Sequence, residues 1–199
     1  MKNRIIICPK TNFTFFCQFV LLILLLAVQG CAYSAYSVYD DERMLDTIRD
    51  DKAMATSIKA ALMQAHFGAS FSVSVYCFYG NVFLVGEASP KVQARAIEIA
   101  RSFHPVSITP HWFSPEKNER SNLVIAADLR ASLIAQKGLS STHIDAEVHA
   151  GRVVLLGVVS NDGEKQLAIQ TARKIKGVTS VTSYLMLPQK PMQPTAHSS

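Results

Sequence analysis

The sequence predicts an α+β protein that contains two copies of one small module behind an export leader. The chain has 199 residues, of which 49% are hydrophobic, which suits one or two globular domains. Three observations support the prediction: a segment of about 65 to 70 residues occurs twice, each copy contains two short runs of alternating apolar residues, and these runs are flanked by segments with apolar residues at helical spacing.

The N-terminal residues have the pattern of a secretory signal peptide. An apolar run covers residues 13–28, and Lys2, Arg4 and Lys10 precede it. A basic start followed by a short apolar segment is typical of an export signal, so we predict a signal peptide over residues 1–30. An uncleaved membrane anchor is the alternative, because the run is close to the roughly 20 apolar residues that span a bilayer.

A short motif closes the apolar run. Val28, Gln29, Gly30 and Cys31 resemble the lipobox of bacterial lipoproteins, in which an aliphatic residue and two small residues precede a cysteine. The resemblance implies cleavage before Cys31 and acylation of its thiol, which would anchor the protein by its fatty acyl chains, palmitate among them. An ordinary signal peptide with a chance cysteine is the alternative. Ala32 follows the cysteine where aspartate would favour inner-membrane retention, which implies an outer-membrane protein facing the periplasm.

The charge of the mature chain is modest. Residues 31–50 are polar and acidic, and we predict that they form a tether between lipid and fold. After Cys31 the chain has 17 basic and 15 acidic residues, a net charge of +2. This excess favours an anionic membrane surface over nucleic acid, which requires clustered lysine and arginine. Cys77 is the one cysteine after Cys31, so no intramolecular disulfide is expected once Cys31 is acylated.

The internal repeat defines the domains. The segment GNVFLVGEAS at residues 80–89 aligns with GRVVLLGVVS at residues 151–160, an offset of 71. We therefore predict one domain over residues 51–113 and a second over residues 121–188. A connector at 114–120 joins them, and a Pro-rich tail at 189–199 is predicted to be disordered.

Each copy is predicted to fold in the order helix, strand, strand, helix, strand. The first helices are expected over residues 51–64 and 122–135, from the helical spacing of their apolar residues. In both hairpins a glycine marks the turn, Gly80 in one and Gly151 in the other, because glycine accepts positive φ at little cost. Gly86 and Gly157 are predicted to permit a bulge or the close approach of a helix.

The second helix of each copy starts with a recognisable signal. Ser89 precedes a proline in the first copy, and Asn161 with Glu164 resembles a capping box in the second. Gly177 is predicted to end the last helix, after a basic end whose residues suit the helix dipole and could alternatively bind a ligand. These basic residues are Arg173, Lys174 and Lys176. Final strands are expected over residues 106–113 and 178–187, so that two helices cover one face of each sheet as an α+β sandwich.

The repeat resembles the BON domain, the bacterial OsmY-and-nodulation module. The resemblance rests on a strand over residues 144–148, Gly151, a V-x-L-x-G strand over residues 153–157, and the pair Gly177-Val178. The first copy departs from the pattern at His104-Pro105-Val106. A lipobox followed by two such domains is similar to outer-membrane lipoproteins of the division- and outer-membrane-stress-associated lipid-binding type.

That resemblance implies binding of anionic phospholipid through the first helix of the second domain. In the family an aromatic residue near the start of this helix enters the membrane, and Val124 stands at the matching position here. The candidate contact residues are Leu123 and Val124 for the apolar part of the bilayer, and Arg120 and Arg130 for its phosphates. The alternative is that Leu123 and Val124 pack against the other domain or the C-terminal strand.

No catalytic set emerges from the sequence. The histidines form no metal-ligating motif, no Gly-rich phosphate loop is present, and Cys77 is predicted to be a buried thiol beside Val73 and Val75. We therefore expect no enzymatic activity, no metal and no cofactor. Trp112 is predicted to pack between the domains. A second functional hypothesis is a scaffold that binds envelope assembly proteins and uses its lipid only as an anchor.

Overall fold

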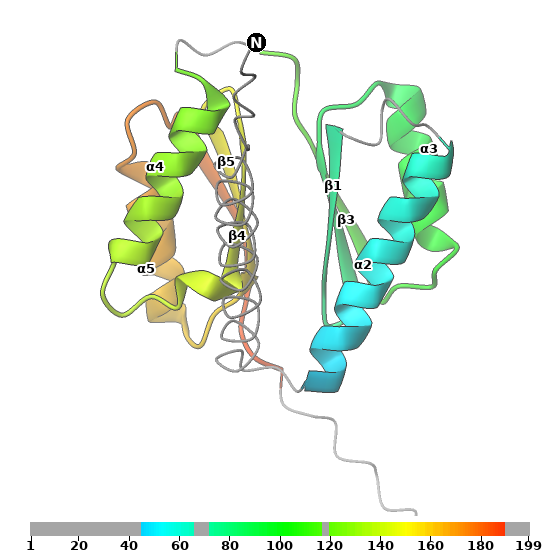
Figure 1. Ribbon diagram of the computed structural model, residues 1–199, viewed down its shortest axis with the longest axis horizontal. Helices are drawn as coiled ribbons and strands as arrows, with labels where there is room; N and C mark the ends of the chain where they lie inside the picture. Colours follow the sequence, from blue (N-terminus) through cyan, green and yellow to red (C-terminus); the bar gives the residue numbers. More distant parts are fainter. Residues whose placement is uncertain (1–44, 66–71, 117–119, 190–199) are drawn as a thin grey trace, which may run out of the picture. The chain divides into compact units, whose positions relative to one another are not determined.

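The computed structural model describes residues 45–65, 72–116 and 120–189, which form two three-stranded sheets and their helices (Figure 1). The first module comprises α2 (Leu45–Ala65), β1 (Val73–Phe78), β2 (Asn81–Gly86), α3 (Pro90–Arg101) and β3 (Ser107–Trp112). The second comprises α4 (Asn122–Ala135), the 3₁₀ turn η2 (Ser141–His143), β4 (Ile144–His149), β5 (Arg152–Val158), α5 (Asp162–Arg173) and β6 (Ser180–Met186). The predicted signal peptide, Cys31 and most of the predicted tether lie outside the described residues.

Both sheets have the same topology. The strand order is β1-β2-β3 in one and β4-β5-β6 in the other, with an antiparallel hairpin and a parallel third strand. A parallel pair requires a crossover connection, which α3 and α5 supply. In each module both helices lie on the same face of the sheet (Figure 1). The predicted α+β fold with two repeated domains is therefore confirmed.

The helix-covered face of each sheet forms a separate core. The first helices contribute residues predicted from the spacing, Ile58, Leu62, Leu129 and Leu133, and the predicted Ile125 is also buried. They pack on inward residues of the hairpins, among them Val73, Val82, Leu84, Ile144, Val153 and Leu155. Cys77 is buried in the first core, as predicted, and its thiol donates a hydrogen bond to Asp51.

Helix α2 begins at Leu45, six residues earlier than the predicted start at Asp51. Ile48 and Asp51 continue the inward face of the helix and are both buried. Asp46 and Asp50 lie on the solvent side, where each contacts the guanidinium of Arg49. The last six residues of the predicted tether are therefore helical, because their acidic residues occupy the exposed face of an amphipathic helix.

A side chain from the first helix of each module holds the hairpin turn. The central residues of both turns have positive φ, 53° and 73° at Tyr79 and Gly80, and the second turn repeats this geometry. These are the angles of a type I′ hairpin, as the glycines predicted. The Asp51 carboxylate accepts from the backbone N–H groups of Tyr79 and Gly80, each at 2.8 Å. Asn122, at the matching position 71 residues later, accepts from Ala150 N–H at 2.7 Å.

Gly86 and Gly157 are required by a neighbouring strand rather than by a helix or a bulge. Each pairs in regular register with the first residue of the adjacent strand, Val73 or Ile144. Their φ angles are 157° and 138°, and a Cβ atom added to either would lie 1.9 Å from a backbone carbonyl oxygen. The predicted bulge or helix contact is therefore wrong, because the close approach is made by the chain just before β1 or β4.

The start of α5 differs from a reciprocal capping box. Asn161 Oδ1 accepts from Glu164 N–H at 3.0 Å, as the motif predicted. The Glu164 carboxylate, however, accepts from the backbone N–H groups of Ser160 and Ser140 instead of Asn161. A buried glutamate thereby joins the start of α5 to the loop before η2.

The second faces of the two sheets pack against each other within one compact unit, residues 41–199. The buried members of this cluster, which we call the inter-sheet face, are Phe78, Phe83, Val85, Phe113, Val154, Leu156 and Val158. Trp112 was predicted to lie between the domains, but it packs on the core of its own module. Its neighbour Phe113 makes the interdomain contact, because successive residues of an extended chain point to opposite faces.

The inter-sheet face has an approximate twofold relation between the modules. Tyr76 donates a hydrogen bond to Glu147 across it at 2.5 Å, and these residues occupy equivalent positions at the offset of 71. His111 and Tyr184 also occupy equivalent places in β3 and β6, and His111 Nδ1 lies 3.1 Å from the Tyr184 hydroxyl. Burial, followed by the Glu147 carboxylate, raises the pKa of Tyr76. In a twofold interface, residues near the axis contact the equivalent residues of the other copy, and these two pairs follow that pattern.

We expect Gly157→Ala to destabilise the protein by about 3 kcal/mol or more, because the new methyl group meets a backbone carbonyl as well as an unfavourable φ. Gly138→Ala is the matched control, since Gly138 has a φ of 79° with nothing within 4 Å of the added Cβ. Its expected cost is about 1 kcal/mol, from backbone strain alone. Urea denaturation would measure both; equal costs would contradict the steric argument.

Candidate functional site

The start of α4 presents two apolar side chains to solvent. Ser121 caps the helix by accepting from Val124 N–H at 3.3 Å, and Asn122 connects it to the β4–β5 turn. Leu123 is 79% exposed and Val124 43% exposed, while the next residue, Ile125, is fully buried. The alternative in which these residues pack on another element is therefore wrong for Leu123, whereas Val124 is partly covered. We call these two residues the apolar tip.

Arg120 connects a neighbouring turn to the start of α4. One guanidinium nitrogen donates to the Lys176 carbonyl at 2.7 Å, and another lies 2.6 Å from an Asp128 carboxylate oxygen. A Cβ added to Gly177 would lie 3.2 Å from atoms of both Arg120 and Ile125, so the turn packs closely on this end of α4. Arg120 was predicted to meet phosphates, whereas the structure engages its guanidinium with protein groups.

The turn that Arg120 holds is strongly basic. Helix α5 ends at Arg173, four residues before the predicted terminator Gly177, and the chain continues in i→i+3 turns through Lys174 and Ile175. Gly177 has a φ of 90° and lies in this turn. Arg173, Lys174 and Lys176 are all exposed, and we call them the basic turn. Arg120 therefore joins the basic turn to the segment just before α4, which the sequence alone did not reveal.

Arg130 occupies a different place. Its guanidinium donates to the carbonyls of Ser141 and Ile144, at 2.9 and 3.0 Å. These bonds connect α4 to η2 and the first residue of β4, about two helical turns from the apolar tip. The structure thus brings together Arg120, Leu123 and Val124 of the predicted set and separates Arg130 from them.

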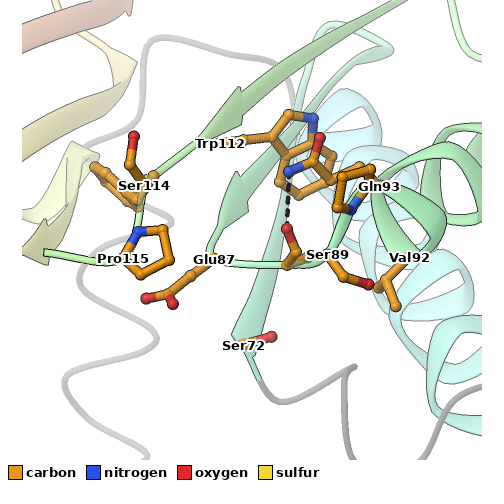
Figure 2. Close-up of a pocket in the computed structure, with 11 residues that line it drawn as sticks. Ser72, Glu87, Ser89, Val92, Gln93, Trp112, Ser114 and Pro115 are labelled. Carbon is orange, nitrogen blue, oxygen red and sulfur yellow. Dashed lines mark hydrogen bonds between the residues drawn. The ribbon is translucent and has the colours of Figure 1, made fainter.

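The first module contains a cleft that the sequence analysis did not find. Figure 2 shows it where β2 and β3 end and α3 begins, with a volume of about 870 Å³. Trp112 and Pro115 supply apolar walls, and Gln93 is held in place by donating to the Ala88 carbonyl at 2.8 Å. Of the lining residues only Glu87 has an ordinarily ionisable side chain, and neither a histidine nor a cysteine is among them.

The described residues contain neither a group of metal ligands nor a membrane-spanning helix. Within residues 45–65, 72–116 and 120–189, no three histidine, cysteine, aspartate or glutamate side chains are grouped so that they could hold a metal ion. None of the helices in these ranges is both long and apolar enough to cross a bilayer. The apolar tip and the basic turn are therefore the candidate binding surface of the described residues.

Comparisons with known proteins agree with the repeated fold. The family model described as the BON domain matches residues 50–107 and 121–187. The chain is 27% identical to osmotically-inducible protein Y of Escherichia coli K12, over 68% of this chain and 72% of that protein. It is also 27% identical to an uncharacterized protein in the gshII 5′ region of Anaplasma centrale, over 69% and 95% of the two chains.

Among solved structures, the chain is similar to the C-terminal domain of CdsD, a structural protein of the type III secretion system of Chlamydia trachomatis. The similarity covers 70% of this chain and 67% of that one, with 14% identity and a TM-score of 0.30.

We expect Arg120→Ala to destabilise the second domain by about 1 kcal/mol, a value reduced for the partial exposure of its ion pair, because the Lys176 carbonyl loses a charged donor. Lys174→Ala removes an exposed charge of the same sign and should change stability by less than about 0.5 kcal/mol. Urea midpoints of the two variants measure the difference. Equal midpoints would show that Arg120 does not hold the basic turn.

Proposed function

This chain belongs to the BON domain family, and from that premise we propose that it is an envelope protein of the osmotic-stress kind that binds anionic phospholipid. In this proposal a lipid on Cys31 anchors the protein in the outer membrane, facing the periplasm, and the apolar tip enters the bilayer. The relationship to osmotically-inducible protein Y supports the envelope role. The lipobox supports the anchor and Ala32 the choice of membrane.

The observation on which the lipid-binding proposal rests is the 79% exposure of Leu123 at the start of α4, where Arg120 also bonds the carbonyl of Lys176 in the exposed basic turn. Water does not favour such a leucine, whereas transfer of its side chain into hydrocarbon contributes roughly 1.5 to 3 kcal/mol. Val124 adds a smaller area and stands where the family has an aromatic residue. The basic turn supplies attraction to anionic headgroups, worth about 1 kcal/mol per lysine or arginine near a charged surface.

In the proposal the roles of the predicted arginines are divided. Arg120 acts as a positioning residue, because its guanidinium holds the basic turn through Lys176 and is itself paired with Asp128. In the proposal Lys174 and Lys176, instead of Arg120, contact the lipid phosphates. Arg130 connects α4 to η2 and β4 through hydrogen bonds and so stabilises the fold of the domain.

The double substitution Leu123→Ser/Val124→Ser should weaken binding to phosphatidylglycerol vesicles about tenfold or more, because two apolar side chains no longer enter the bilayer. Cosedimentation of the unlipidated chain from Ala32 onward measures this. Ile134→Ser is the matched control: Ile134 is 60% exposed at the other end of the same helix, and its replacement should leave binding unchanged.

The wild-type chain should bind phosphatidylglycerol vesicles more tightly than neutral phosphatidylcholine vesicles, and added salt should reduce the difference. Equal binding to both vesicle types, or binding that survives the double substitution, would argue against this surface as the lipid contact. Photocrosslinking from position 124 to a protein but never to lipid would favour the scaffold hypothesis instead.

The anchor has its own test. Cells that express the protein are labelled with a radioactive fatty acid, and the label is expected on the wild type and absent from Cys31→Ala, because the thiol is the acceptor. Cys77→Ala is the control and should retain the label, since Cys77 is buried in the first core. An unlabelled wild type would remove the lipid anchor from the proposal, while the vesicle result would stand independently.

A further inference from the structure

A group of ionisable and aromatic residues lies at one side of the inter-sheet face. His111 on β3 faces Tyr184 on β6, and its ring meets those of Phe113 and Tyr184 edge-on at centroid distances of 5.1 and 5.8 Å. Arg152 of β5 lies over the Phe113 ring, 5.4 Å from its centroid. His111 and Arg152 therefore belong to different domains and meet at the same aromatic residue.

The surroundings of His111 oppose a positive charge on it. Burial, followed by the positive charge of Arg152, lowers the pKa of His111. Arg152 is itself held in place, because it donates to the Ser114 carbonyl at 2.6 Å and lies 3.2 Å from the Glu116 carboxylate. The guanidinium remains charged at all physiological pH values, so protonated His111 would place a second cation at a half-buried contact.

A second histidine lies at the same side of the inter-sheet face. The ring of His149 stacks on Phe113 at a centroid distance of 5.1 Å, and its Nε2 lies 2.9 Å from a Glu87 carboxylate oxygen. This contact between the domains becomes an ion pair when His149 is protonated. The titratable and charged groups around the site are thus His111, Tyr184, Arg152, His149, Glu87 and Glu116.

We propose that His111 makes the contact between the two sheets sensitive to acid, so that its protonation loosens the inter-sheet face while each domain stays folded. The balance follows from proton linkage. A histidine whose pKa is lowered in the closed form takes up its proton more readily in the open form. Acid therefore favours the open form as the pH falls below the ordinary histidine value of about 6.5. The cores of the two modules are separate from this contact, which lets the domains part without unfolding.

The experiment is hydroxyl-radical footprinting of the whole protein at about pH 7.5 and about pH 5.5, a range above the ordinary pKa of carboxylates. Oxidation of Phe83, Phe113 and Tyr184 is expected to rise about threefold or more at the lower pH, because protonation of His111 favours the form in which these rings are open to solvent. Phe103, which packs on the first core, serves as the internal control and should not change.

Three substitutions separate the contributions. His111→Gln should abolish the rise, while His104→Gln, at an exposed position, should retain it. Arg152→Gln is an independent variant in case His111→Gln does not fold. It is expected to reduce the rise, because the cation that disfavours protonated His111 is gone.

Several results would overturn the proposal. These are an absent rise in the wild type, a rise that persists in His111→Gln, or a parallel rise at Phe103, which would indicate unfolding of the module. The proposal does not depend on lipid binding or on the anchor at Cys31, and it can fail or stand separately from them.

Discussion

The structure depends on burying both faces of two small sheets. In each module the two helices cover only one face of the three-stranded sheet. The middle strands β2 and β5, however, have apolar residues on both faces. A single module would leave a row of phenylalanine or aliphatic side chains in water. Packing the second faces together removes this apolar surface from water. Duplication of the module therefore supplies the partner sheet that each copy needs.

The same requirement explains which features the two modules share and which differ. Both copies have apolar positions that face the helices, a type I′ turn, and a helix side chain that hydrogen-bonds to this turn. On the inter-sheet face equivalent positions have different residues, such as Tyr76 opposite Glu147 and His111 opposite Tyr184. If the two modules had identical residues here, a twofold contact would place each side chain beside an identical one. Because the residues differ, a hydrogen-bond donor of one module can meet an acceptor of the other.

The surface that we assign to lipid lies away from this central contact, at the start of α4. Rigidity there comes from backbone contacts: Asn122 holds the hairpin turn, and Arg120 holds the carbonyl of Lys176. A leucine on such a support loses little backbone freedom on binding, which favours insertion of a small apolar tip. Arginine suits the supporting role because its planar group donates in several directions at once.

Local patterns in the sequence determined the modules, the helical faces and the hairpin turns, because period, glycine placement and the repeat all act over a few residues. Leu123 and Val124 could also be named from a resemblance. Only the tertiary structure decided that both are exposed, that Arg120 and Arg130 serve backbone carbonyls, and that Phe113 rather than Trp112 lies between the sheets. These outcomes depend on which distant segments meet, and neither periodicity nor composition contains that information.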